Sequence, residues 1–128
     1  MNKVFVTYSM PAEQLSQLSE YCDVDAWQGK GSIPRDELMA RVGGVDGIIC
    51  LLTDRIDAEL INASKNLKAI SCVSVGVDHI DVGTLTARGI PLGHTPGVLV
   101  DATADLAFGL LLAAARRIPQ GDRYARTG

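Results

Sequence analysis

Apolar positions along the chain fall into two kinds of segment. Some are short, nearly continuous runs rich in valine, isoleucine and leucine, which is typical of strands buried in a sheet. Others place apolar residues at helical spacing, with polar residues between them. The runs predict strands over residues 3–7, 24–27, 45–52, 67–75 and 90–93. The helical spacing predicts a helix over residues 11–21, and the residue types at their ends predict further helices over residues 34–42, 57–64, 81–88 and 101 to about 117.

Residue types at the ends of these segments support the assignment. Three aspartates stand where helix N-caps are expected: Asp57, Asp81 and Asp101. Pro11 suits a first helical turn, whereas Gly43-Gly44 and Gly89 are typical of helix ends. Pro119 is expected to break the last helix, and the residues that follow it, 120–128, are polar.

Strands that alternate with helices predict an α/β fold with a doubly wound, five-stranded parallel sheet covered on both faces, followed by a long C-terminal helix. In such folds ligands bind beyond the carboxyl ends of the strands. The strand ends to inspect are residues 7–10, 51–54, 74–79 and 94–97.

The first two candidate loops carry little binding chemistry. Met10-Pro11 ends the first strand without the glycines and free N–H groups of a flavin-phosphate loop, and without the acidic pair of a phosphoacceptor domain. Gly29-Lys30-Gly31-Ser32 lacks the upstream glycine of a phosphate-binding loop, so we interpret it as a flexible turn. The sequence contains no G-x-G-x-x-G.

The segment after the fourth strand is more informative. Gly76 frees the backbone to turn, and successive N–H groups at such a turn make a small anion site. A tight strand-to-helix turn explains the same residues and is favoured on composition alone. His79 and His94 have side chains suited to general acid catalysis, but structural roles are favoured because no cysteine or serine nucleophile lies at a motif spacing from either.

Composition narrows the class of protein. The 128 residues are 47% apolar and 21% charged, as in one globular domain. A net charge of -3 and 5% aromatic residues argue against binding to nucleic acid or to an anionic membrane. The three cysteines form no C-x-x-C pair, so we expect no metal site and interpret them as reduced core residues of a cytoplasmic protein. We expect no signal peptide and no membrane span.

Several stretches carry a recognisable family pattern. The most specific are SVGVDH at residues 74–79 and TPGVLVDATADLA at residues 95–107. KVFVTYSMPAEQL at residues 3–15, Ile33-Pro34 and GIICLLTD at residues 47–54 fit the same pattern. The chain thereby resembles the D-isomer-specific 2-hydroxyacid dehydrogenases, and among them the glyoxylate/hydroxypyruvate reductases. The resemblance implies a flavodoxin-like substrate domain over residues 1–98. It also implies that residues 99–128 hold an interdomain, dimerisation helix and the start of a Rossmann domain.

The resemblance also implies roles for individual residues. The backbone N–H groups of Val75 and Gly76 match positions that hold the substrate carboxylate, and Leu52 matches a residue lining the substrate pocket. Thr103 matches a position that faces the nicotinamide of NAD(P)H. The family's catalytic arginine, histidine and glutamate, and its glycine-rich dinucleotide fingerprint, match nothing in this chain, so we expect them beyond residue 128. The chain departs from the family pattern at two positions: Leu99 stands where many relatives have asparagine, and Asp105 where most have glutamate.

Two functions of different classes remain open. One is the substrate-binding part of an NAD(P)H-dependent 2-oxoacid reductase, inactive alone, binding small 2-oxoacids weakly and NAD(P)H not tightly. The other is a stand-alone flavodoxin-like module for binding or assembly. In the helix between Ala102 and Arg117, the residues from Leu106 to Ala115 are apolar around the whole circumference, which predicts burial on every side. In the family the equivalent helix lies at the centre of a homodimer, so we expect association through it; folding back over the chain's own sheet is the alternative.

Overall fold

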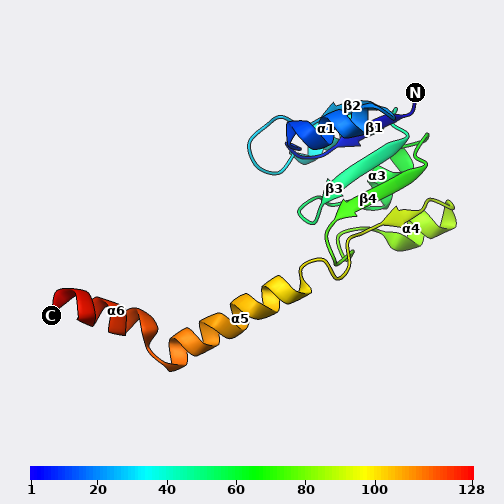
Figure 1. The fold of residues 1–128 in the computed structure, drawn as a ribbon. Coiled ribbons are helices and arrows are strands. Elements are labelled where there is room, and N and C mark those ends of the chain that lie inside the picture. The colour runs from blue at the N-terminus through cyan, green and yellow to red at the C-terminus, as the bar shows by residue number, and fades with distance from the viewer. The chain divides into compact units, whose positions relative to one another are not determined.

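The computed structural model describes residues 1–128 and has the alternating order of strands and helices that the sequence predicts (Figure 1). The strands are β1 (Lys3–Val6), β2 (Asp23–Ala26), β3 (Gly47–Leu51), β4 (Ala69–Val73) and β5 (Leu92–Gly93). The helices are α1 (Ala12–Ser19), α2 (Arg35–Val42), α3 (Ala58–Ala63), α4 (Val82–Ala87), α5 (Val100–Ala115) and α6 (Ile118–Thr127). The strand bounds differ from the expected ones by about one or two residues, as is usual where the hydrogen bonding of an element ends.

All five strands run parallel in one sheet with the order β2-β1-β3-β4-β5. This is the flavodoxin-like order, in which the chain moves from β1 outward to β2 and then crosses back to β3. The α/β class and the doubly wound parallel sheet are therefore confirmed. Because the order reverses between β1 and β3, the carboxyl ends of the central strands form the expected ligand-binding edge.

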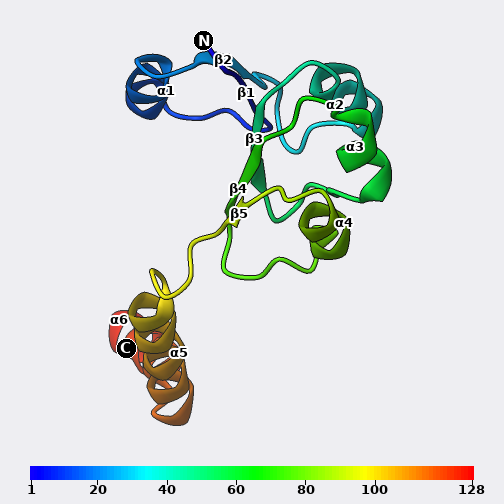
Figure 2. The same ribbon diagram turned by 90° about the vertical axis from the view of Figure 1, so that its right-hand side faces the viewer.

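One face of the sheet carries the hydrophobic core. Figure 2 shows α2, α3 and α4 along this face, and α1 on the opposite side. Strand residues such as Phe5, Ile48 and Ile70 pack there against helix residues such as Leu60 and Leu85. The side chains of the core cluster are Phe5, Ile33, Leu38, Val42, Val45, Ile48, Cys50, Ile56, Leu60, Ile61, Leu67, Ile70, Cys72, Ile80, Leu85 and Ile90. The three cysteines are all buried and free, as their interpretation as core residues requires.

The other face is covered less completely than the sequence predicted. Burial alternates along β3 and β4 instead of being continuous, so the two strands are not buried equally on both sides. On β4 the residues of this face, Ala69, Ser71 and Val73, are exposed. The continuous apolar run therefore predicted the strand correctly, but the prediction that both faces of the strand are buried was wrong.

Two of the three expected aspartate caps form. The Asp57 carboxylate accepts a hydrogen bond from Leu60 N at 3.1 Å, and the Asp81 carboxylate accepts one from Thr84 N at 3.0 Å. Each satisfies an N–H group that the first helical turn leaves unpaired. Gly89 follows α4 with a φ of +65°, a left-handed conformation that favours glycine and ends the helix as expected.

The expectations for the C-terminal segment are partly wrong. Asp101 is not an N-cap, because α5 begins earlier: Leu99 occupies the cap position and Asp101 lies in the first turn. There its negative charge still faces the positive end of the helix dipole. After the expected break the chain forms a further helix, α6, which the sequence did not predict and which has Pro119 in its first turn. The break lies at Arg117, whose φ of 54° is left-handed, so Pro119 begins the next helix instead of ending the structure.

The chain divides into two compact units, Met1–Pro96 and Gly97–Gly128. The first contains the whole sheet and α1 to α4, and the second contains α5 and α6. The functional division into residues 1–98 and 99–128 remains a prediction. None of the six helices has both the length and the apolar character required to cross a bilayer.

Candidate functional site

The loops that leave β3 and β4 run side by side beyond the carboxyl edge of the sheet. Leu51 pairs with Val73 at the last position of the two strands, and Ile56 pairs with Ile80 in an isolated parallel bridge further on. Ile56 N donates to His79 O at 3.0 Å, and Asp81 N donates to Ile56 O at 2.9 Å. Both loops are thereby held by backbone hydrogen bonds, which gives this edge a defined shape.

The turn after β4 is held through its carbonyl groups. Thr95 donates to Ser74 O twice, from its backbone N at 2.9 Å and from Oγ1 at 3.1 Å. His94 Nδ1 lies 2.9 Å from Val75 O, and because a carbonyl only accepts, the imidazole donates. The segment that follows β5 therefore holds two successive carbonyls.

These contacts determine where the next two N–H groups point. In a planar trans peptide the N–H is directed away from the C=O of the same unit. Fixing Ser74 O and Val75 O toward residues 94–95 therefore aims the N–H groups of Val75 and Gly76 away from them. No hydrogen bond within residues 1–96 uses either N–H. Two adjacent unused donors at a strand end can bind an anion.

Side chains beneath the turn support it from the sheet. Ser74 Oγ donates to Gly76 O at 2.6 Å, and it lies 2.8 Å from Cys72 Sγ. His79 Nε2 lies 3.1 Å from the same sulfur. Burial, together with the neighbouring Cys72 and Asp54, raises the pKa of the Cys50 thiol, which is therefore neutral at physiological pH.

The loop after β3 is anchored by a buried carboxylate. Asp54 is 4% exposed and accepts hydrogen bonds from Thr7 Oγ1 at 2.5 Å and from Leu51 N at 2.8 Å. Its own N–H donates to Leu51 O at 3.1 Å, which closes a tight turn. Leu52 lies in this turn and is 64% exposed, and Val75 is 50% exposed at the end of the neighbouring strand. The edge therefore presents apolar side chains beside the two N–H groups.

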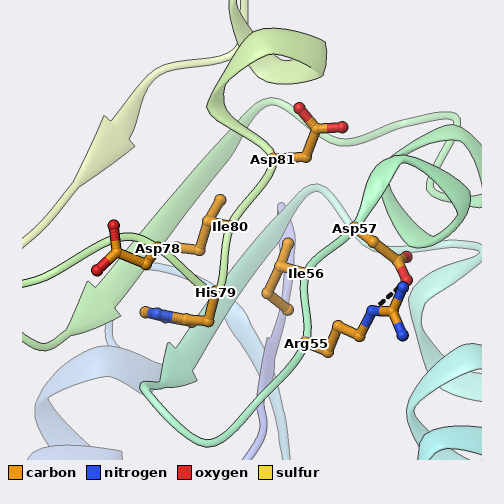
Figure 3. Close-up of a pocket in the computed structure, with 7 residues that line it drawn as sticks. All are labelled: Arg55, Ile56, Asp57, Asp78, His79, Ile80 and Asp81. Carbon is orange, nitrogen blue, oxygen red and sulfur yellow. Dashed lines mark ion pairs between the residues drawn. The ribbon is translucent and has the colours of Figure 1, made fainter.

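A pocket of about 400 Å³ lies between the same two loops (Figure 3). Its lining residues are Arg55, Ile56, Asp57, Asp78, His79, Ile80 and Asp81. Three of them are carboxylates, and the single arginine is already paired, with Arg55 Nε 3.0 Å from Asp57 Oδ2. The pocket is therefore acidic and unsuited to a carboxylate ligand, unlike the turn at Val75 and Gly76.

Two of these aspartates are held ionised by their surroundings. Burial tends to raise the pKa of Asp57, but the Arg35 guanidinium at 2.7 Å and the Leu60 N–H outweigh it, so that the pKa lies below its ordinary value. Hydrogen bonds from Thr84 N and Oγ1 lower the pKa of Asp81. Both carboxylates act chiefly as helix caps.

The structure places the residues expected at the site in two groups. Leu52, Val75 and Gly76 lie together at the carboxyl edge of β3 and β4. Thr103 lies in the first turns of α5, where its N donates to Leu99 O at 3.0 Å. Sequence reasoning missed that His94 and Thr95 orient the turn, although both lie at a strand end that it marked for inspection.

Comparison with known proteins identifies the family. Residues 4–120 match the family described as "D-isomer specific 2-hydroxyacid dehydrogenase, catalytic domain". The chain belongs to the D-isomer-specific 2-hydroxyacid dehydrogenase family. The family expected from the SVGVDH and TPGVLVDATADLA stretches is thus confirmed.

Similar dehydrogenases include glyoxylate reductases from distant organisms. The chain is 50% identical over 127 residues to a glyoxylate reductase from Thermofilum pendens and 45% identical over 129 residues to a glyoxylate reductase/hydroxypyruvate reductase from Mus musculus. It covers 38% and 39% of those two proteins, while each alignment covers 98% of this chain. The chain therefore spans well under half the length of the relatives that it matches.

Solved structures give the same relationship. A protein from Thermus thermophilus superposes with a TM-score of 0.85 at 48% identity, covering 98% of this chain and 40% of that one. An NADPH-dependent glyoxylate/hydroxypyruvate reductase from Sinorhizobium meliloti, in complex with NADP and malonate, superposes with a TM-score of 0.71 at 28% identity. That superposition covers 99% of this chain and 38% of the reductase.

Proposed function

We propose that the chain is the N-terminal, substrate-binding part of an NAD(P)H-dependent 2-oxoacid reductase of the glyoxylate/hydroxypyruvate type. The observation that carries the proposal is the pair of unused N–H groups at Val75 and Gly76, held by His94 and Thr95. The similarity to glyoxylate reductases supports the choice of substrate class. The malonate in the Sinorhizobium meliloti reductase supports recognition of a small carboxylate within this family.

In this proposal the chain binds and orients the substrate but does not reduce it. The N–H groups of Val75 and Gly76 hold the carboxylate, while Leu52 and Val75 limit the size of the remaining substituent. NAD(P)H supplies the hydride in the complete enzyme. The 128 residues contain no glycine-rich dinucleotide turn, so no tight cofactor binding and no turnover are expected from this chain alone. Thr103 is proposed to face the nicotinamide once the dinucleotide domain is present.

We further propose that α5 joins two copies of the chain. Its large apolar side chains lie on all sides of the helix and are exposed: Leu106, Phe108, Leu110, Leu111 and Leu112. Burying such side chains stabilises the associated state by about 1.5–3 kcal/mol each, which favours association.

The proposed compartment is the cytoplasm, and the three free cysteines support a reducing environment.

A titration followed by backbone amide chemical shifts tests the carboxylate site. Glyoxylate and malonate are added to the ¹⁵N-labelled chain, with glycolaldehyde as a neutral ligand without a carboxylate. We expect both anions, and not glycolaldehyde, to shift the Val75 and Gly76 signals. Two hydrogen bonds to a charged oxygen give at best about millimolar affinity once binding costs are included. Unmoved Val75 and Gly76 signals at high anion concentration would refute the proposal and favour a binding or assembly module of another kind.

A further inference from the structure

A second group of polar side chains lies beneath the turn, inside the core. Cys50 of β3 and Cys72 of β4 occupy paired positions in the parallel ladder. Side chains at paired positions point to the same face of a sheet, and both cysteines belong to the core cluster under α2, α3 and α4. His79 leaves the loop after β4 and brings its Nε2 to 3.1 Å from Cys72 Sγ.

The three side chains offer their donor atoms to a common point. The two sulfurs and an imidazole nitrogen all lie within 4.8 Å of one another. Ligands that are about 2.0–2.3 Å from a single tetrahedral zinc ion are separated by distances of this order. The spacing therefore fits one ion between the three groups after small adjustments of the side chains.

The chemistry of the donors selects the class of ion. Two sulfurs and one imidazole are soft or borderline ligands, preferred by Zn²⁺ and similar thiophilic cations, whereas Mg²⁺ and Ca²⁺ prefer oxygen. We propose that Cys50, Cys72 and His79 form a binding site for a thiophilic divalent cation, with Zn²⁺ as its ligand. On binding, each thiol transfers its proton to solvent and the sulfur binds the metal as thiolate; no oxidation or reduction takes place.

The site has an approach from solvent and room for a fourth ligand. Both cysteines are fully buried, but His79 is half-buried and also lines the pocket of about 400 Å³ described above. An ion can therefore reach the imidazole from the pocket before it contacts the sulfurs. Ser74 Oγ, 2.8 Å from Cys72 Sγ, is a neutral oxygen close to the cluster, and a water molecule is the alternative fourth ligand.

This site is separate from the proposed carboxylate site and does not depend on it. The carboxylate is bound by backbone N–H groups above the turn, whereas the cation is bound by side chains within the sheet and below the turn. The two are connected through Cys72, which contacts both Ser74 and His79, and through the loop after β4 that carries Val75, Gly76 and His79. A bound ion would therefore hold the base of the turn in place without contacting the substrate.

Cobalt(II) titration of the reduced chain tests the proposal, because thiolate-bound tetrahedral Co²⁺ has a charge-transfer band and strong visible absorption. We expect one Co²⁺ per chain with both spectral features, and their loss when Zn²⁺ is added. His79→Ala alters a half-buried loop residue and removes one metal ligand. Loss of a residue that only hydrogen-bonds to a ligand lowers metal affinity by roughly 10–100-fold, so His79→Ala should lower the affinity for Co²⁺ by more than this. Cys72→Ser should abolish the charge-transfer band or weaken it strongly.

Cys22→Ser is the matched control. Cys22 is also buried and free, but it lies just before β2, at the far edge of the sheet, with its Sγ 3.2 Å from Leu18 O. Its replacement should leave the cobalt spectrum and stoichiometry unchanged. Cobalt binding without a thiolate band, or with equal affinity in the wild-type and His79→Ala chains, would overturn the proposal. So would the absence of binding by the reduced, folded wild-type chain.

Discussion

The sheet unit and the helical unit are both rich in apolar residues, but they use them differently. In Met1–Pro96 the apolar side chains of the core, such as Ile48, Leu60 and Leu85, are at most 1% exposed. In Gly97–Gly128 no residue of α5 or α6 is buried, and Leu106 and Leu111 are 65% and 61% exposed. Apolar content alone therefore does not say where a side chain lies.

The periodicity of the apolar residues accounts for the difference. In the sheet unit, strands and helices each have one apolar face, and these faces cover one another. In α5 the residues from Leu106 to Ala115 are apolar in every direction apart from a glycine, so no single neighbour can cover them. The first pattern describes a core that the unit completes by itself, and the second describes an apolar surface that the helical unit leaves uncovered.

The largest expected effect is a loss of stability that occurs in one unit and not in the other. Leu60→Ala leaves a cavity in the core cluster and should lower the free energy of unfolding by about 2–5 kcal/mol. Leu106→Ala in α5 should change the unfolding of the sheet by no more than about 0.5 kcal/mol. Urea denaturation at low protein concentration measures both values. Equal losses would mean that α5 belongs to the same core.

The second prediction concerns association. Leu111→Lys places a charge on the exposed apolar surface of α5 and should weaken self-association by about tenfold or more, since burying a leucine contributes about 1.5–3 kcal/mol. Light scattering across a dilution series gives the dissociation constant. Leu52→Lys, at an equally exposed position in the other unit, is the control and should leave it unchanged. A wild-type chain that remains monomeric at tens of micromolar would contradict the dimer.

A smaller effect is expected at the carboxylate site. His94→Ala removes the donor that holds Val75 O and should weaken binding of glyoxylate by about threefold to tenfold, corresponding to one hydrogen bond of about 0.5–1.5 kcal/mol. The Gly76 amide shift on titration reports the affinity. His94→Asn offers a shorter N–H donor and should restore part of it. An unchanged affinity in His94→Ala would show that the turn holds its shape without this contact.

The smallest effect is a dependence of stability on pH within the sheet unit. Because hydrogen bonds lower the pKa of Asp81 in the folded chain, its contribution is present above the unfolded pKa of about 3.9 and is lost as the pH falls through the lower folded value. The urea concentration at the midpoint of unfolding should therefore decrease as the pH is lowered from about 5 to about 3. Asp81→Asn should reduce the slope of this dependence on pH. Thr84→Val removes only the Oγ1 donor and should reduce it less. An identical slope in all three chains would exclude Asp81 as its source.

Local signals explain which parts of the fold were predictable. Apolar runs gave all five strands, and Asp57 and Asp81 gave two helix starts, because a cap depends on neighbours three residues away. The cover on the second face of β4 was overestimated, and the helix after Pro119 was not predicted. Whether a strand face is covered depends on elements that are distant in the sequence. A proline that breaks one helix also suits the first turn of another.

The candidate site was predictable in position but not in construction. The strand-end rule located the turn around Gly76, and the family resemblance named Val75 and Gly76. The contacts that hold the site join residues far apart in the chain, such as Thr7 with Asp54 and His94 with Val75. Cys50 and Cys72 likewise lie close together because of the register between β3 and β4, and this register cannot be read from the sequence.

The backbone donors at Val75 and Gly76 have a consequence for how the proposed enzyme can evolve. A substitution replaces a side chain but, proline apart, leaves the N–H group of the main chain, so recognition of the negative charge persists through most mutations. In the proposed site, recognition of size depends instead on the side chains of Leu52 and Val75, which single substitutions readily alter. Enzymes that use the proposed site can therefore change their specificity from one 2-oxoacid to another of different size while they retain binding of the carboxylate.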